Sequence, residues 1–301
     1  MSNGKQYYGA YFWITLVSFA VPIFVGWKAF ENLSPTTKPV PQLDASGVDH
    51  AVWDYLLKSY VSYGLVDYDG MKKDYLFREY LGELGACNPN ALETDDDKLA
   101  LACNAYNAFV IDGIIGHDIR DTCNGFEQEN VGFFDLKEHI FAGQTMSLND
   151  LEHGKIRPEF RDPRIHVALV CAARSCPAIR GEAYIGERIQ TQLDDQSKLF
   201  ANNPKYVNYD SESNTLLLSQ ILKWYGEDWD AKYPNGGYLE WLAGLVDKPA
   251  MKVTIEEAIR KQVTVGFSTY DWTLNSQAEP GAKQASSKKS GGFGSGSSPD
   301  E

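Results

Sequence analysis

The segment from Arg164 to Pro177 carries the chain's densest group of side chains that could do covalent chemistry. His166, Cys171 and Cys176 fall within eleven residues of one another. A cysteine reacts as its thiolate, and a nearby histidine, arginine or helix N-terminus lowers the pKa of a thiol from about 8.5 toward neutrality. Cys176 follows Arg174 and precedes a proline that suits a helix start. We therefore expect Cys176 to be a nucleophile, with His166 as its base.

The same segment also has a purely structural interpretation. The side chains from Ile165 to Ala172 alternate as they would along a buried strand, which ends in the turn that contains Ser175. Free cysteines are among the most buried residues of proteins, so both thiols could simply fill a core. Loops at strand ends are nevertheless common places for sites, and Ser175 is a candidate binding residue there.

A second polar group follows the sequence Ser147 to Asp150, whose spacing is that of a helix-starting capping box. The predicted helix carries Glu152, His153 and Arg157 within its few turns. His153 is the alternative catalytic base, and Glu152 is a candidate binding residue. Arg157 could bind a substrate carboxylate through two parallel N–H bonds.

Two amides interrupt the most hydrophobic helix that the sequence predicts, Lys98 to Gly116. Asn104 and Asn107 are three residues apart and share one face of this helix, which is apolar nearly all round and therefore buried. An unsatisfied buried polar group costs about 1–3 kcal/mol, so both amides need partners. They either bond to neighbouring backbone and organise the core, or line a site as binding residues, where they could orient an imidazole or an oxyanion.

The remaining pattern predicts an α+β domain with a mixed or antiparallel sheet packed by helices. Two hairpins are expected, over Phe133–Met146 and Lys205–Ser219, and a last strand within Val263–Trp272. Further helices are expected over Val48–Val61, Met71–Leu84, Gly186–Ala201, Tyr238–Val246 and Ile255–Gln262.

The N-terminal segment from Tyr7 to Trp27 contains no charged residue and is long enough to cross a bilayer as a helix. A cleaved signal peptide is the alternative, but no A-x-A-like cleavage site follows the segment. We expect a single-pass membrane protein with its globular domain on the extracytoplasmic, periplasmic side. The expected organisation is an anchor over 1–30, a Pro-rich spacer over 31–47, the globular domain over 48–275 and a disordered tail over 276–301.

Net charge and cysteine spacing limit the partners and the metal or disulfide sites that we expect. The formal net charge of −13 repels phosphate backbones, and we expect no nucleic-acid partner. Cys87 and Cys123 both lie in turn-like sequence, and a disulfide between them would fit an oxidising compartment. Cys171 and Cys176 form a loose C-x4-C pair without a second pair at zinc-finger spacing. A dithiol or metal site there is a third alternative, but we expect neither a metal nor a cofactor.

Six motifs in one order resemble the domain of unknown function 547 family. They span roughly Val48 to Asn275 and are VDYDG at 66–70, NAYNA at 104–108, SLNDLEHGKIR at 147–157, CAARSCP at 171–177, LLLSQILKWYGEDW at 216–229 and YDWTLN at 270–275. The resemblance implies an α+β domain, often in secreted or membrane-attached bacterial proteins, and implies little about activity. A papain- or transglutaminase-like architecture is an analogy only. The family usually has a large apolar residue where Cys103 stands, which indicates a core role for this thiol.

Two functions from different classes follow from these observations. One is a membrane-anchored, cysteine-dependent hydrolase or acyl-transfer enzyme that uses Cys176 with His166 or His153. The other is a non-catalytic accessory or binding subunit of a larger membrane complex, in which the thiols are structural. The bilayer is the expected partner of Tyr7–Trp27 in both cases.

Overall fold

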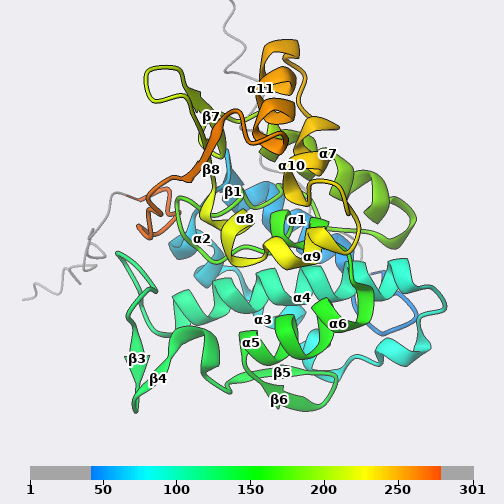
Figure 1. Ribbon diagram of the computed structural model, residues 1–301. Coiled ribbons are helices and arrows are strands. Elements are labelled where there is room, and N and C mark those ends of the chain that lie inside the picture. Colours follow the sequence, from blue (N-terminus) through cyan, green and yellow to red (C-terminus); the bar gives the residue numbers. More distant parts are fainter. Residues whose placement is uncertain (1–41, 279–301) are drawn as a thin grey trace, which may run out of the picture. The chain divides into compact units, whose positions relative to one another are not determined.

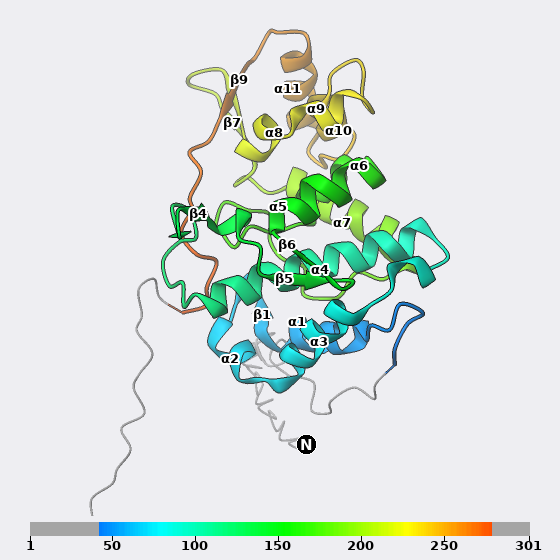
Figure 2. The same cartoon turned by 90° about the horizontal axis from the view of Figure 1, so that it is seen from below.

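The structure, a computed structural model, describes residues 42–278. Two hydrophobic cores lie along this part of the chain. The first contains the helices up to α7, and the second contains β7 to β9 with α8 to α11. Figure 2 shows the second group of elements beside the helical body rather than inside it. The predicted anchor and most of the predicted spacer and tail fall outside the described residues.

A long helix, α4 (Asp95–Gly116), runs through the middle of the first core (Figure 1). Thr94 caps it by accepting from the Asp97 N–H, and three acidic residues in its first turn favour the positive end of the helix dipole. It is the one helix among residues 42–278 that is long and apolar enough to cross a membrane, and it is mostly buried inside the domain. The predicted buried central helix is therefore confirmed.

Helices on one side of α4 complete the first core. They are α1 (His50–Tyr60), α2 (Tyr68–Lys73) and α3 (Tyr75–Ala86), with the short pair β1 (Val61–Ser62) and β2 (Leu65–Val66) between α1 and α2. Asp74 ends α2 and caps α3, so the single helix expected over Met71–Leu84 is two helices. A 3-10 turn, η2 (Pro89–Ala91), leads into α4. Trp53 of α1 stacks on Tyr80 of α3 with ring centroids 5.2 Å apart.

The chain between α4 and α7 is built of short elements. They are β3 (Glu127–Gln128), β4 (Val131–Gly132), η3 (Phe133–Asp135), β5 (His139–Phe141), β6 (Gln144–Met146), α5 (Leu148–Leu151), η4 (Glu152–Ile156), α6 (Arg157–Phe160), η5 (Pro163–Val167), η6 (Gly186–Arg188) and α7 (Ile189–Ala201). The β5–β6 hairpin turns at Ala142 and Gly143, and Ser147 with Asp150 forms a capping box. The capping box is confirmed, and the hairpin expected over Phe133–Met146 forms only from His139 onward, because Phe133–Asp135 is a 3-10 helix.

The second core surrounds a three-stranded mixed sheet in the order β7-β8-β9. The strands β7 (Val207–Asp210) and β8 (Thr215–Leu218) form the predicted hairpin, and β9 (Thr264–Phe267) pairs parallel to β8. Helices α8 (Gln220–Trp224), α9 (Gly226–Asp230), α10 (Tyr238–Ala243) and α11 (Pro249–Ile259) pack around it. The domain is thus α+β, with a mixed sheet smaller than its helical body.

The strand expected from Ile165 to Ala172 does not form, and that prediction is wrong. Pro163–Val167 is the 3-10 helix η5, and irregular chain follows. The amide of Asn107 supplies the hydrogen bonds that a neighbouring strand would have made to Ala168 and Val170. Ala172 has a positive φ of 60°, which an extended strand does not allow.

Candidate functional site

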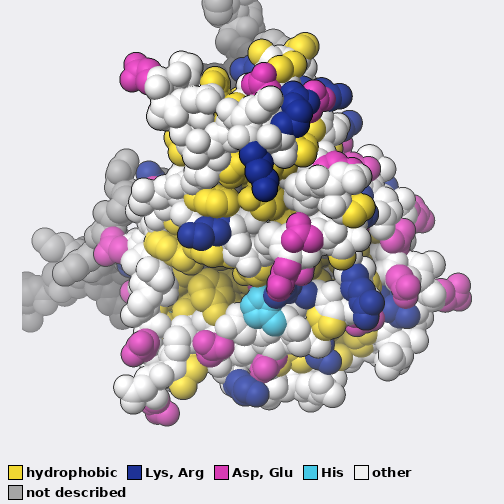
Figure 3. All heavy atoms as spheres, in the orientation of Figure 1, with side chains coloured by type: hydrophobic (Ala, Val, Ile, Leu, Met, Phe, Trp, Pro, Cys, Tyr) yellow, Lys and Arg dark blue, Asp and Glu magenta, His cyan; other side chains and the backbone are white. Residues whose placement is uncertain are grey.

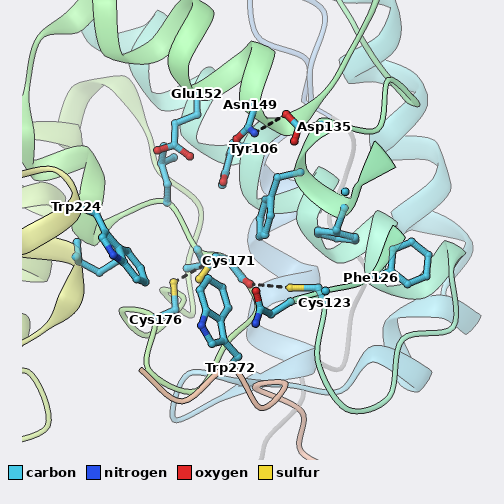
Figure 4. Close-up of a pocket in the computed structure, with 18 of the residues that line it drawn as sticks. Tyr106, Cys123, Phe126, Asp135, Asn149, Glu152, Cys171, Cys176, Trp224 and Trp272 are labelled. Carbon is cyan, nitrogen blue, oxygen red and sulfur yellow. Dashed lines mark hydrogen bonds between the residues drawn. The ribbon is translucent and has the colours of Figure 1, made fainter. Parts of the chain in front are cut away.

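A pocket of about 440 Å³ lies where the two cores meet. The first core contributes aromatic side chains from α4 and from residues 126–134, and the second contributes α8. Figure 3 shows hydrophobic side chains gathered in a hollow on this face. Figure 4 shows Cys171 and Cys176 near Trp224 and Trp272, with Glu152 in the wall as well. Pockets of this size between two cores are common ligand sites.

Hydrogen bonds from two sides hold the loop that carries Cys171 and Cys176. Asn107, which is 3% exposed, donates to the Ala168 carbonyl (3.0 Å) and accepts from the Val170 N–H (3.0 Å). The C-terminal segment holds the other side, because Arg174 N–H donates to the Thr273 carbonyl at 2.7 Å. Two segments that resemble the family, CAARSCP and YDWTLN, are therefore neighbours in the fold.

Cys171 is the thiol whose surroundings lower its pKa. The residue is half-buried and lines the pocket, and its Sγ lies 3.0 Å from the Tyr270 hydroxyl. Hydrogen bonding from the Cys176 thiol, and then from Tyr270, lowers the pKa of Cys171 against the opposing effect of burial. The thiolate therefore forms more readily at Cys171 than at an isolated cysteine.

Cys176, the nucleophile that the sequence suggested, is in a different environment. It is 3% exposed, and its Sγ accepts the Cys171 N–H at 3.0 Å. Burial raises the pKa of Cys176, and the adjacent Cys171 raises it further. Of the two thiols, Cys176 is the one that stays protonated and donates.

His166 lines the same pocket and is held by a carboxylate that the sequence reasoning missed. Its Nε2 lies 2.6 Å from Asp228 Oδ2, and its ring stacks on Tyr225 with centroids 4.0 Å apart. The hydrogen bond from His166, followed by that from Arg157, holds the pKa of Asp228 well below its usual range, although burial opposes this. Since an ionised carboxylate only accepts, Asp228 fixes the proton on Nε2. In the neutral ring, Nδ1 is then the basic atom.

Arg157 and His153 complete this polar network behind the pocket wall. Arg157 donates Nε and Nη2 to the two oxygens of Asp228, both at 2.9 Å, and Nη1 to His153 Nδ1 at 3.2 Å. The Arg157 guanidinium, which was expected to bind a substrate carboxylate, therefore binds the carboxylate of Asp228 instead. Because arginine has no acceptor, His153 Nδ1 carries no proton in this arrangement. Among residues 42–278, no hydrogen bond joins either histidine to Cys171 or Cys176.

Glu152 lines the pocket at a point where the helix departs from α-helical geometry. Residues Glu152–Ile156 form a π-helical turn between α5 and α6, and such turns are frequent at functional sites. Glu152 is 6% exposed and lines the pocket. Burial raises the pKa of Tyr106 and of Tyr225, and the Glu152 carboxylate raises both further. Its negative charge therefore lies beside two phenol groups.

The other two predicted binding residues lie outside this pocket. Asn104 donates to the Tyr184 carbonyl (2.8 Å) and accepts the Tyr184 N–H (2.9 Å). Ser175 Oγ accepts the Asp271 N–H at 2.8 Å, which ties the turn to the C-terminal segment. Asn104 and Asn107 both bond to neighbouring backbone, and Asn104 Nδ2 also lies 3.2 Å from Nδ1 of the His50 imidazole.

The cysteines are all free thiols in the described part of the chain. The disulfide between Cys87 and Cys123, which the sequence left open, is therefore absent from the described residues. Cys87 lies in a separate pocket beside Phe141, whereas Cys123 donates to the Cys171 carbonyl at 3.5 Å. Within residues 42–278 no three His, Cys, Asp or Glu side chains are placed to hold a metal ion.

Comparison with known proteins gives a single family. No curated protein and no solved structure matches the chain, so the papain- or transglutaminase-like analogy stays a prediction. The matched segment, residues 89–201, contains both candidate cysteines and His166 but ends before Asp228 and Tyr270. It matches the model of the family described as "Protein of unknown function, DUF547", which supports a relation of this chain to that family.

Proposed function

We propose that the pocket is a cysteine-dependent acyl-transfer site with Cys171 as its nucleophile. The observation that carries the proposal is the environment of the Cys171 sulfur. Cys171 is a half-buried residue in the wall of a pocket, and two donors, Cys176 and Tyr270, lower the pKa of its thiol. A thiolate that is both accessible and stabilised is the usual state of a reactive cysteine.

The reaction begins when the Cys171 thiolate attacks a substrate carbonyl carbon. A sulfur–carbon bond forms, and the bond from that carbon to the leaving group breaks. His166 Nδ1, which takes the thiol proton as the Cys171 thiolate forms, gives that proton to the leaving group and then takes a proton from water or another acyl acceptor. That acceptor attacks the thioester, the acyl group leaves, and the thiolate is restored.

His166 is the base of this scheme because of its place and its partner. It is the one histidine among the described residues that line the pocket, and Asp228 holds its ring as the third member of a catalytic triad would. Hydrogen bonds of this kind are often long before substrate binds. His166 Nδ1 and Cys171 Sγ are therefore expected to approach each other when the acyl group is bound.

Labelling of the folded protein with an activated acyl ester tests the proposal. We expect one acyl group per wild-type chain by intact mass and none on the C171A variant. The C123A variant is the matched control, because Cys123 lines the same pocket but burial raises its pKa to about 12. It should be labelled like the wild type.

The pH profile of alkylation gives a second readout. The rate rises as the pH passes upward through the pKa of Cys171, because the thiolate is the reacting form. In the C176A variant the midpoint should move to higher pH, because a hydrogen bond that stabilises the thiolate is lost. A wild-type Cys171 that resists both reagents would contradict the proposal and favour the non-catalytic accessory subunit.

A further inference from the structure

We propose that the pocket takes a ligand with a protonated alkylamine, whose charge is bound by Glu152 and whose apolar part lies among the aromatic walls. As a statement about substrate class, this rests on the proposed acyl-transfer function. As a statement about binding, it rests on the charges and rings of the pocket alone.

The Glu152 carboxylate lacks a cationic partner. No lysine or arginine nitrogen within residues 42–278 lies within 4.0 Å of it, although its side chain is only 8% exposed. The nearest basic nitrogen is His153 Nδ1 at 3.9 Å, which accepts from Arg157 and is unprotonated. Arg157 itself is bound to both oxygens of Asp228. Its hydrogen-bonding partners are the neutral phenols of Tyr106 and Tyr225, and Arg157 acts on it only from beyond 4.0 Å. A buried carboxylate is stabilised further by a cation in direct contact, and a ligand ammonium group would supply one.

The other charged residues that line the pocket also favour a positively charged ligand. No lysine or arginine is found among the described residues that line the pocket, whereas Glu127 and Asp135 are. A ligand carboxylate or phosphate would meet three acidic side chains there and no lysine or arginine, so an anion is disfavoured. An ammonium group is attracted both by these charges and by aromatic ring faces.

The aromatic walls select the remainder of the ligand. The rings of Tyr106, Tyr225, Trp224 and Trp272 surround the same space, and Figure 4 shows Tyr106 and Glu152 together in one part of it. A volume of about 440 Å³ suits a small molecule rather than a folded chain. The ligand class is therefore an alkylamine with an aliphatic or aromatic body, free or as the side chain of an extended peptide.

Calorimetric titration with phenethylamine and its neutral counterpart 2-phenylethanol tests this inference. The wild-type protein should bind the amine roughly ten- to a hundredfold more tightly, as expected for a charge-assisted hydrogen bond in a buried site. The E152Q variant should lose this preference. The E227Q variant, which removes an exposed carboxylate near Arg157 and outside the pocket, should retain it.

Further comparisons distinguish a variant that does not fold from a failure of the amine inference, and that failure from one of the acyl-transfer proposal. If E152Q does not fold, E152D keeps the charge and should keep the preference, and the two-ligand comparison on the wild type needs no variant. The comparison of the amine with the alcohol on the wild type does not depend on whether Cys171 reacts. Equal affinity of the wild type for the amine and the alcohol would overturn the inference without touching the acyl-transfer proposal.

Discussion

Replacing Asp228 with asparagine is expected to lower the proposed acyl-transfer rate by ~10³-fold or more and to destabilise the fold by about 2 kcal/mol. Asp228 is the shared acceptor of His166 Nε2 and of two Arg157 donors. The neutral asparagine amide can donate as well as accept, so it no longer holds the His166 proton on Nε2. His166 can then carry its proton on Nδ1, which leaves that atom without a lone pair to accept a proton. The stability loss is below that of a fully buried pair, because 26% of the Asp228 side chain is exposed.

The pH dependence of this loss identifies its cause. The pKa of Asp228 is depressed in the folded state, so its stabilising contribution is complete above the unfolded-state value of about 3.9. That contribution is lost as the pH falls through the folded-state pKa. Urea unfolding should therefore show a gap between wild type and D228N that is constant near pH 7 and narrows below about pH 4.

Glu227 provides the matched control for this measurement. Its side chain is 82% exposed and approaches Arg157 Nη2 only to 3.5 Å. Exposed pairs of this kind contribute about 0–1 kcal/mol, so E227Q should unfold nearly as the wild type does. A D228N protein with wild-type stability and acyl-transfer rate would show that the carboxylate neither orients His166 nor holds Arg157.

The parts of the fold that depend on local rules could be predicted from the sequence. The hairpin turn at Ala142 and Gly143, the capping box at Ser147 and the buried helix α4 all arise from neighbouring residues and from hydrophobic pattern. The cysteine segment was mispredicted because its apolar alternation resembles a strand. Its hydrogen bonds are instead made by the side chain of Asn107, 61 and 63 residues earlier in the chain.

The candidate site was found only in part for the same reason. Cys171, His166 and Glu152 could be selected by residue type, but their partners lie far along the chain. Asp228 follows His166 by 62 residues, and Tyr270 follows Cys171 by 99. No spacing rule reaches that far. The sequence favoured Cys176 over Cys171 because residue spacing does not show which of two neighbouring thiols is the more deeply buried.

Replacing Asn107 with alanine is expected to cost about 3 kcal/mol of folding free energy and to slow the reaction of Cys171. The change leaves the Ala168 carbonyl and the Val170 N–H without partners, and both residues are at most 2% exposed. Each such buried group costs about 1–3 kcal/mol. Because Val170 directly precedes Cys171, the sulfur should also lose its fixed position beside Tyr270.

Asn104 distinguishes a loss of position from a loss of stability. It lies three residues earlier on the same helix and holds the Tyr184 backbone through the same two kinds of bond. N104A should therefore destabilise the protein by about the same amount. The segment it releases does not carry a cysteine, so alkylation of Cys171 in the folded N104A protein should proceed at the wild-type rate, whereas N107A should be slower under the same conditions. Equal rates in the two variants would mean that Asn107 supports the core without positioning the thiol.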